Sequence, residues 1–503
     1  MPDPAGVELS GPLRTALGET GALGATVRQL AARLDDTPGR VEAALDRMQR
    51  TGDVLRMGRG LWVLRAFERL EERDDFVDPA VFVERFERET GVALGRYSGP
   101  ITFRSNEALP VHRWWPYVQG YSAEFVRGVL DREELRPGGT VLDPFAGSGT
   151  TLVEARLAGH RAVGTELLAP AVLAARVKTR FELAPADLAR AAGRLVASAR
   201  RRRPGPLPFL RETTRQFSAA ALRDLTRLRD ALPDEGSATS DALRLAFGRV
   251  LIPSSRLHRS PCLGYRRGPA SGGPPPFDRL LEAIGEMADD LGELRRSRDR
   301  WGPAAEVRTA DARTAGWPAG SVDLAVTSPP YVNGMDYVMN YKIDLAWLGY
   351  AHSYADLVRL RTAEVACDNL PRRETRAYLG LDDLPDPWLA DILSRIRANV
   401  ERHGSYRRDD AHAVVHRYFA DLVPVLRGVY RALVPGGRFV VVVGDSLLAG
   451  EYVPGDLILA RLARSNGFAI RSVEIARARR SGQRRSFGLR ETVVTLERPR
   501  AAG

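Results

Sequence analysis

Cysteine and histidine are scarce in this chain. Of its 503 residues only Cys262 and Cys367 are cysteines, which is too few for a disulfide framework or a four-cysteine zinc site. So low a cysteine content fits a reducing compartment. The 7 histidines show no paired spacing typical of metal ligands. We therefore expect neither structural disulfides nor a bound metal.

Long apolar runs are also missing. No run approaches the length needed to cross a bilayer, and the amino terminus lacks a charged segment followed by an apolar one. We expect a cytoplasmic protein without a membrane partner.

Arginine supplies nearly all of the positive charge. Lys178 and Lys342 are the only lysines among 74 basic residues, and the net charge is +11. This excess suits a polyanionic partner. A GC-rich genome, which by itself raises arginine content, is the alternative explanation. At 503 residues the chain exceeds what one hydrophobic core usually supports, so several domains are expected.

A strand, a glycine-rich turn and a helix are predicted in succession near residue 147. Residues 140–142 are apolar, and DPFAGSGTT at 143–151 leads into helical spacing. Gly147 and Gly149 let backbone approach a ligand closely, and the N–H groups of the helix start favour a carboxylate. Asp143, at the strand end, can accept from an ammonium group. The alternative is a tight turn that binds nothing.

Two more acids end predicted strands downstream. Glu166 closes the strand-like segment 161–166, about 20 residues after the glycine turn, where a carboxylate would bind ribose hydroxyls. Asp311 lies in a third strand-like segment and could contact an adenine amino group. Acids at strand ends are common, but their serial order predicts a pocket for S-adenosylmethionine.

A proline-rich loop follows the predicted buried strand at 321–326. Ser328 and the Pro329 carbonyl could accept both hydrogens of a planar exocyclic amine, whose lone pair would then point at a methyl sulfonium. Pro329 and Pro330 fix φ and position these acceptors in advance. Tyr331 offers a ring on which an extruded base could stack. A rigid proline turn without a ligand is the alternative.

Together these motifs resemble the prokaryotic S-adenosylmethionine-dependent DNA amino-methyltransferases, which methylate N4 of cytosine or N6 of adenine. The resemblance runs from about His112 to Pro499, with two insertions. It implies an α/β fold with a Rossmann-like, seven-stranded methyltransferase sheet in the order 3-2-1-4-5-7-6. It also implies that Tyr117 lines the cofactor site.

The site residues expected from the motifs and the resemblance fall into two groups. The expected catalytic residues are Ser328, Pro329, Pro330 and Tyr331. The residues expected to bind the cofactor are Tyr117, Asp143, Phe145, Gly147, Ser148, Gly149, Thr150, Glu166 and Asp311.

Serine at position 328 favours N4 of cytosine, because the resembled family more often has aspartate there in its adenine methylases. Neither cysteine lies in a Pro-Cys-Gln-like setting, which argues against methylation of a ring carbon. The alternatives are an N6-adenine DNA methylase, an RNA base methylase, and a DNA-binding regulator with a degenerate core. Double-stranded DNA is the expected partner, with a cognate restriction or defence-system protein as a second one, and the location would be nucleoid-associated.

The segment 1–66 resembles a winged-helix module, with three predicted helices and a hairpin with a basic tip. Its recognition helix would be 37–50, with Arg40 and Arg47 facing DNA. Docking of another protein is the alternative role. A charged helix at 67–90 is expected to link the module to the core.

Arginines also gather in the predicted insertions and near the end of the chain. Those around Tyr265 could grip a phosphate backbone, or could simply face water. The tentative DNA-binding residues are Arg40, Arg47, Arg259, Arg266, Arg484 and Arg485. The expected domain plan is a winged-helix-like domain at 1–66, a helical linker at 67–111, core segments at 112–183, 301–361 and 413–503, and helical insertions at 184–300 and 362–412.

Overall fold

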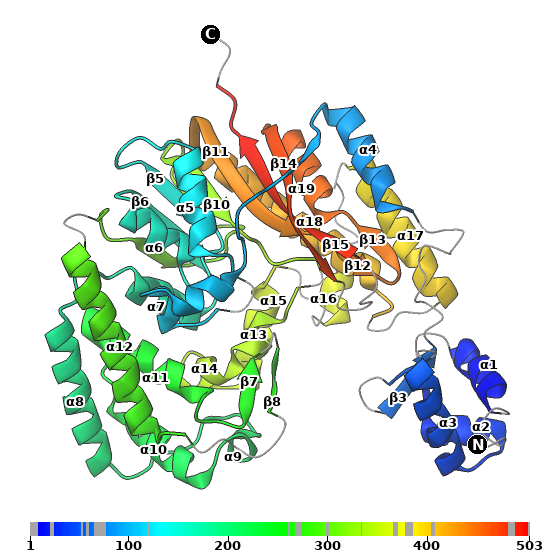
Figure 1. The fold of residues 1–503 in the computed structure, drawn as a ribbon, viewed down its shortest axis with the longest axis horizontal. Helices are drawn as coiled ribbons and strands as arrows, with labels where there is room; N and C mark the ends of the chain where they lie inside the picture. Colours follow the sequence, from blue (N-terminus) through cyan, green and yellow to red (C-terminus); the bar gives the residue numbers. More distant parts are fainter. Residues whose placement is uncertain are drawn as a thin grey trace.

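A central sheet flanked by helices dominates the computed structural model (Figure 1). The residues that the structure describes are 9–20, 25–51, 54–56, 60–64, 77–117, 120–259, 262–266, 273–297, 301–332, 334–365, 371–377, 386–403, 408–480 and 488–500.

The sheet has eight strands in the order β4-β14-β15-β11-β10-β5-β6-β9. The strands are β4 (Leu94–Arg96), β5 (Thr140–Asp143), β6 (Arg161–Glu166), β9 (Glu306–Thr309), β10 (Val322–Thr327), β11 (Leu433–Gly444), β14 (Ala469–Arg480) and β15 (Gly488–Glu497). Read from β9 to β14, their order is the expected 3-2-1-4-5-7-6. The α/β fold class and this strand order are confirmed.

The expected strand number was one too small. The eighth strand, β4, pairs in parallel with β14 at the edge of the sheet, and Tyr97 N donates to Ile475 O at 3.0 Å just beyond it. This strand comes from 67–111, the segment predicted as a helical linker. Only three residues long, it shows no alternation from which a strand could be recognised.

Parallel pairing brings the two sequence motifs to the same edge of the sheet. Strand β10 is parallel to β5 on one side and to β11 on the other, with Leu324 opposite Val141 and Ala325 opposite Leu142. The loops that follow Asp143 and Thr327 therefore start side by side. This is where ligands bind in open α/β sheets.

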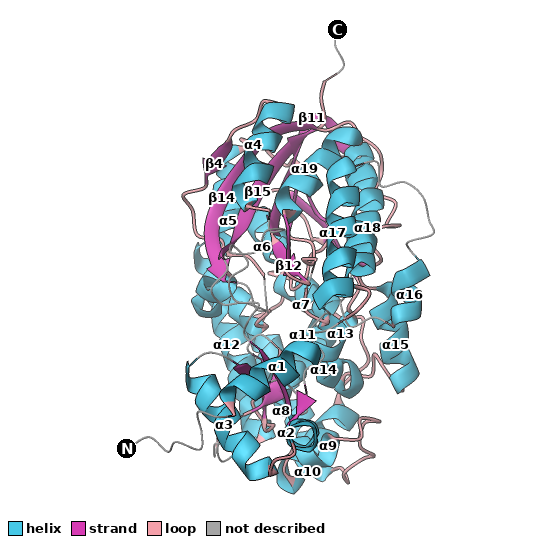
Figure 2. Cartoon of the chain, turned by 90° about the vertical axis from the view of Figure 1, so that its right-hand side faces the viewer, coloured by secondary structure: helices cyan, strands magenta, loops and turns pink. Residues whose placement is uncertain are grey.

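Helices cover both faces of the sheet because its inner strands are apolar on both sides. On β11, Val440 and Val442 belong to the cluster that includes Phe125 of α5 (Ala123–Arg132). The alternate residues Phe439 and Val441 belong to the cluster of α18 (Ala411–Ala432) and α19 (Gly455–Ser465). Helix α17 (Pro387–His403) packs beside α18, outside this layer (Figure 2).

A separate helical layer occupies the lower left of Figure 1 and shares an apolar cluster with α7 (Ala169–Lys178). Its elements are α8 (Pro185–Arg201), α9 (Thr213–Gln216), α10 (Ala219–Ala231), α11 (Ala238–Leu251), the hairpin β7 (Leu257–Arg259) and β8 (Leu263–Tyr265), and α12 (Pro276–Ser297). The largely helical character expected for 184–300 is present. The domain boundaries remain predictions.

The remaining elements of the core are short. They are α4 (Pro79–Thr90), the 3-10 helices η5 (Phe103–Ala108) and η6 (His112–Trp114), α6 (Thr150–Leu157), α13 (Tyr337–Asn340), α14 (Lys342–Trp347), α15 (Tyr354–Ala363), α16 (Arg372–Ala377), and the hairpin β12 (Ser446–Leu448) and β13 (Glu451–Val453).

The amino-terminal residues form three helices and a small antiparallel sheet of order β1-β3-β2. These elements are α1 (Ser10–Thr20), β1 (Ala25–Thr26), α2 (Val27–Leu34), α3 (Pro38–Thr51), β2 (Val54–Arg56) and β3 (Leu61–Leu64). Thr26 and Gln29 form a capping box at the start of α2, which explains its sharp beginning. The identification of these amino-terminal elements as a winged helix, and their role, remain predictions.

Within the described residues, every helix is too short or too polar to cross a bilayer.

Candidate active site

The glycine turn between β5 and α6 is built so that side chains are excluded from two positions. Gly147 has φ +51°, and a Cβ there would lie 2.9 Å from the Tyr117 ring. Gly149 has φ +86°, and a Cβ there would lie 2.9 Å from Ala175. Glycine is thus required both by backbone conformation and by space. The turn leaves room for a ligand against its backbone.

A cavity of about 900 Å³, partly open to solvent, lies against this turn; we call it the cofactor cavity. Most residues expected to bind the cofactor line it: Tyr117, Phe145, Gly147, Ser148, Thr150, Glu166 and Asp311. Ser328 and Pro330 of the proline loop line it as well. Asp143 and Gly149 are not among its lining residues.

Asp143 is instead buried between strands. Its Oδ1 accepts from Phe145 N at 3.0 Å and from Thr327 Oγ1 at 2.6 Å, and its Oδ2 accepts from Tyr121 Oη at 2.7 Å. Burial raises the pKa of Asp143, while these donors lower it. The structure therefore gives Asp143 a connecting role, and the predicted contact with an ammonium group remains a prediction.

Glu166 is held by the backbone around it. Its Oε2 accepts from Gly147 N and its Oε1 from Leu168 N, each at 2.9 Å. Burial raises the pKa of Glu166, and these backbone N–H groups lower it. The carboxyl thus joins the glycine turn to the end of β6, at the wall of the cavity where ribose hydroxyls were expected.

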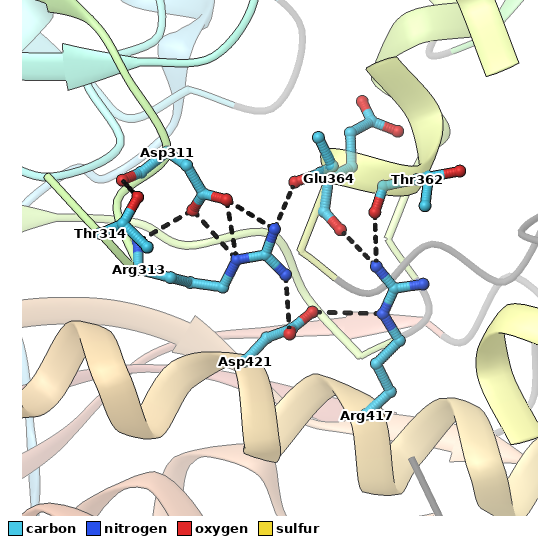
Figure 3. A network of polar contacts seen from close by, with 8 residues as sticks. Asp311, Arg313, Thr314, Thr362, Glu364, Arg417 and Asp421 are labelled. Atoms are coloured by element: carbon cyan, nitrogen blue, oxygen red, sulfur yellow. Dashed lines mark hydrogen bonds and ion pairs between the residues drawn. The ribbon is translucent and has the colours of Figure 1, made fainter. Parts of the chain in front are cut away.

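Asp311 is oriented by a neighbouring arginine. Arg313 Nε lies 3.0 Å from both oxygens of Asp311, and its Nη1 lies 2.8 Å from Asp421 Oδ1 on α18 (Figure 3). Asp311 Oδ1 also accepts from Arg313 N at 2.9 Å. The carboxylate that follows β9 is therefore fixed before any ligand arrives.

A larger cavity of about 2400 Å³, including space open to solvent, adjoins the first; we call it the outer cavity. Ser328, Pro329 and Tyr331 line it, together with basic side chains: Arg249, Arg259, Arg477 and Arg479. The residues that line both cavities are Tyr117, Gly120, Tyr121, Ser328 and Tyr337. Ser328 thus lies where the two cavities meet.

Tyr331 is anchored at its hydroxyl and covered on its ring. Its Oη donates to Glu491 Oε1 at 2.5 Å, and the Arg479 guanidinium carbon lies 5.3 Å from the ring centroid. A Cβ at Gly444 would lie 2.9 Å from this ring, so glycine is needed at the end of β11. Burial and the Glu491 carboxylate raise the pKa of Tyr331 well above 10.

The tentative DNA-binding arginines occupy different settings. Arg259 forms an ion pair with the buried Asp344, lies 4.4 Å from the Tyr341 ring centroid, and also lines the outer cavity. Arg266 donates from Nε to Leu257 O at 2.8 Å. Arg40 pairs with Asp36 at 3.3 Å. For each of them, DNA contact remains a prediction.

For the other three tentative arginines, the structure gives little information about a role in DNA binding. Arg47 lies on α3 and is half-buried. Arg484 and Arg485 fall outside the described residues. Among the residues that the structure does describe, no cluster of His, Cys, Asp or Glu could hold a metal ion.

The lining residues that were not expected from the sequence include three with polar side chains: Tyr121, Tyr337 and Glu364. Tyr337 follows the proline loop closely, so that its proximity was a usable signal. Its ring stacks on Tyr117, with centroids 6.1 Å apart and planes at 16°. Glu364 comes from the segment predicted as an insertion, where no motif marks it.

Comparison with known proteins gives a consistent result. Residues 124–175 match a family model described as DNA methylase. Type II methyltransferase M.BsoBI of Geobacillus stearothermophilus is 22% identical over 457 residues, covering 79% of this chain and 88% of that protein. Type II methyltransferase M.AvaI of Nostoc sp. is 22% identical over 438 residues, covering 79% and 89%.

Among solved structures, TrmN from Thermus thermophilus matches with a TM-score of 0.24 and 12% identity, over 75% of this chain and 48% of that one. The chain therefore spans about half of that protein. The cradle at Gly147 and the fixed carboxyls of Glu166 and Asp311 suit a ligand with an amino-acid end and a nucleoside end. The family match and this cavity assign S-adenosyl-L-methionine as the cofactor.

Proposed function

We propose that this chain is a DNA methylase that methylates an exocyclic amine of a DNA base, with N4 of cytosine as the favoured target; the match of residues 124–175 to a family model described as DNA methylase supports this. The observation that carries the proposal is the position of Ser328 in the lining of both cavities. A donor in one cavity and an extruded base in the other would meet at this residue.

Bound S-adenosyl-L-methionine would supply a methyl group on a positively charged sulfur. Gly147, Glu166 and Asp311 would hold the cofactor at the carboxyl ends of β5, β6 and β9. Phe145, Ser148, Thr150 and Tyr117 would complete its walls. Such prepositioning lowers the entropy cost of bringing the two reactants together.

The proline loop would orient the acceptor amine. Ser328 Oγ and the Pro329 carbonyl oxygen would each take one amino hydrogen, which would turn the nitrogen lone pair toward the cofactor cavity. Tyr331 would support the base, because its hydroxyl is anchored on Glu491. An extruded base and Arg479 compete for the ring of Tyr331, so Arg479 would shift when the base enters.

DNA would approach over the outer cavity. Its arginine lining and the net charge of +11 favour a phosphate backbone. We propose double-stranded DNA as the partner, and the cytoplasm as the place of action. A cognate restriction protein is a further proposed partner.

The experiment is expression of the chain in a host without DNA methylases, followed by mass spectrometry of the digested DNA. We expect N4-methylcytosine, and none from the matched Ser328→Ala chain. Detection of N6-methyladenine alone would overturn the cytosine assignment but would still support a DNA amino-methyltransferase. Unmodified DNA, with methyl transfer to RNA instead, would favour an RNA base methylase. Long-read sequencing of the same DNA would identify the recognised site.

A further inference from the structure

Glu364 places a buried carboxyl in the wall of the cofactor cavity, and the proposed reaction does not use it. The residue follows α15, is 7% exposed and lines the cavity with Ala363 and Val365. Its Oε1 accepts from Val338 N at 3.0 Å. Among the described residues, its Oε2 has no hydrogen-bond partner although it is buried. A buried polar atom without a partner is costly, so a ligand group is the natural candidate to satisfy it.

The backbone that carries this carboxyl is clamped in place. Arg313 Nη2 donates to Ala363 O at 2.9 Å. Arg417 Nη2 donates to Thr362 O at 2.8 Å and to Glu364 O at 3.1 Å. Figure 3 shows both guanidinium groups on the backbone side, with the Glu364 side chain extending away from them. We call residues 362–365 the strap.

One acid joins the two arginines to each other. Asp421 on α18 accepts from Arg313 Nη1 at 2.8 Å and from Arg417 Nε at 3.3 Å (Figure 3). Arg313 also orients Asp311, so a single guanidinium fixes both Asp311 and the strap. Buried ion pairs of this kind are weak sources of stability but define geometry well. The carboxyl of Glu364 is thus preset, as a ligand-binding group should be.

The position of the strap indicates which end of the cofactor Glu364 would contact. The reacting methyl group must lie near Ser328, after β10, and the strap is instead tied to Asp311, after β9. In the sheet, β9 is separated from β10 by β5 and β6. The cofactor must therefore extend its nucleoside toward β6 and β9, where Glu166 and Asp311 also lie. Asp336 and Glu166 act electrostatically on Glu364, so this wall is rich in hydrogen-bond acceptors.

We propose that Glu364 is a cofactor-binding residue that accepts a hydrogen bond from the adenosine part of S-adenosyl-L-methionine, from a ribose hydroxyl or the adenine amino group. The inference rests on the proposed function. Burial raises the pKa of Glu364 well above its usual 4.5, with the negative charge of Asp336 adding to the effect. A neutral carboxyl suits an uncharged nucleoside better than an ammonium group.

Calorimetry with two ligands tests this assignment. S-adenosylhomocysteine carries both ends of the cofactor, whereas 5′-methylthioadenosine lacks the amino-acid end. Glu364→Ala should lower the affinity for both ligands by a similar factor, about tenfold or more, as expected for one buried hydrogen bond. Glu364→Gln keeps an acceptor oxygen of the same reach and should stay within about threefold of wild type. Glu401→Ala, on the exposed side of α17, is the matched control and should change neither affinity.

Each outcome bears on a different claim. Wild-type affinity of Glu364→Ala for both ligands would overturn the inference alone. A lower affinity for S-adenosylhomocysteine with an unchanged affinity for 5′-methylthioadenosine would also overturn the inference, because the carboxyl would then act at the amino-acid end. Failure of the wild-type chain to bind either ligand would contradict the proposed function itself. If Glu364→Ala unfolds, Glu364→Asp serves in its place, since withdrawing the acid by one methylene should give the same loss.

Discussion

Thr327 Oγ1 donates to Asp143 Oδ1 across 2.6 Å, and this bond joins the last residue of β10 to the last residue of β5. The two loops that form the candidate active site start at these two residues. Both side chains are essentially inaccessible to solvent. This buried contact therefore adds to the parallel pairing of β5 and β10 in fixing the glycine turn relative to the proline loop.

Replacing Thr327 with valine tests this contact while keeping the side-chain shape. Asp143 would lose a donor inside the protein, so the free energy of unfolding should fall by about 1–3 kcal/mol. Urea denaturation measures the change. Thr314→Val is the control, because Thr314 is exposed and its hydroxyl lies 3.5 Å from Asp311 O. Equal losses for the two variants would mean that the bond to Asp143 has no special weight.

Ser328→Ala separates binding from chemistry. The variant should keep its affinity for S-adenosylhomocysteine and lose methyl transfer by about two orders of magnitude or more, since Ser328 is proposed to act on the amine. Calorimetry and transfer of a labelled methyl group measure the two quantities. Ser321→Ala, which removes an exposed hydroxyl bonded to Pro318 O, should change neither. If cofactor affinity falls as far as turnover, the role of Ser328 is misassigned.

Asp143→Ala distinguishes a ligand contact from a connecting role. The predicted contact with the cofactor's ammonium group requires weaker cofactor binding. The three hydrogen bonds seen for Asp143 require lower stability as well. Calorimetry and thermal melting should both respond. Melting that drops while the affinity of the folded fraction stays at the wild-type value would leave only the connecting role.

Lys178 predicts a pH dependence of stability. Its Nζ donates to Trp115 O at 2.8 Å, and burial lowers its pKa well below 10.5. The unfolded chain then binds more protons than the folded one at pH values between the two pKa values, so this group makes stability rise with pH. Lys178→Met should flatten the dependence of the unfolding free energy on pH in the range below the usual lysine pKa of 10.5.

The other lysine provides the comparison for this prediction. Lys342→Met removes the chain's other lysine, at the half-buried start of α14, and is the comparison variant. A Lys178→Met chain whose stability follows the wild-type curve in parallel would show that the buried ammonium does not titrate in this range.

The sequence was most informative where a motif follows a predicted strand. Parallel strands end at one edge of the sheet, so the order of Gly147, Glu166, Asp311 and Ser328 along the chain predicted that they would share a site. The structure brings all four to the lining of one cavity. Strand order could be expected from the family resemblance, and it is confirmed.

The sequence was least informative where distant segments meet. Asp143 receives its donors from Tyr121 and Thr327, 22 and 184 residues away, so its connecting role has no local signal. The position of Glu364 depends on arginines at 313 and 417, which no spacing rule links to it. Arg259 illustrates the same limit, since its ion pair with Asp344 spans 85 residues.

The short strand β4 restricts how the chain can be trimmed from its amino end. Leu94, Gly95 and Arg96 occupy the outer side of β14 at Val473–Ile475. A shortened protein starting near residue 77 would retain this cover. One starting beyond Arg96 would bare the hydrogen-bonding groups of a sheet edge, and bare edges invite self-association. Truncations that test the role of the amino-terminal helices in DNA binding must therefore stop before β4. Otherwise, aggregation of the shortened protein would be mistaken for a loss of affinity for DNA.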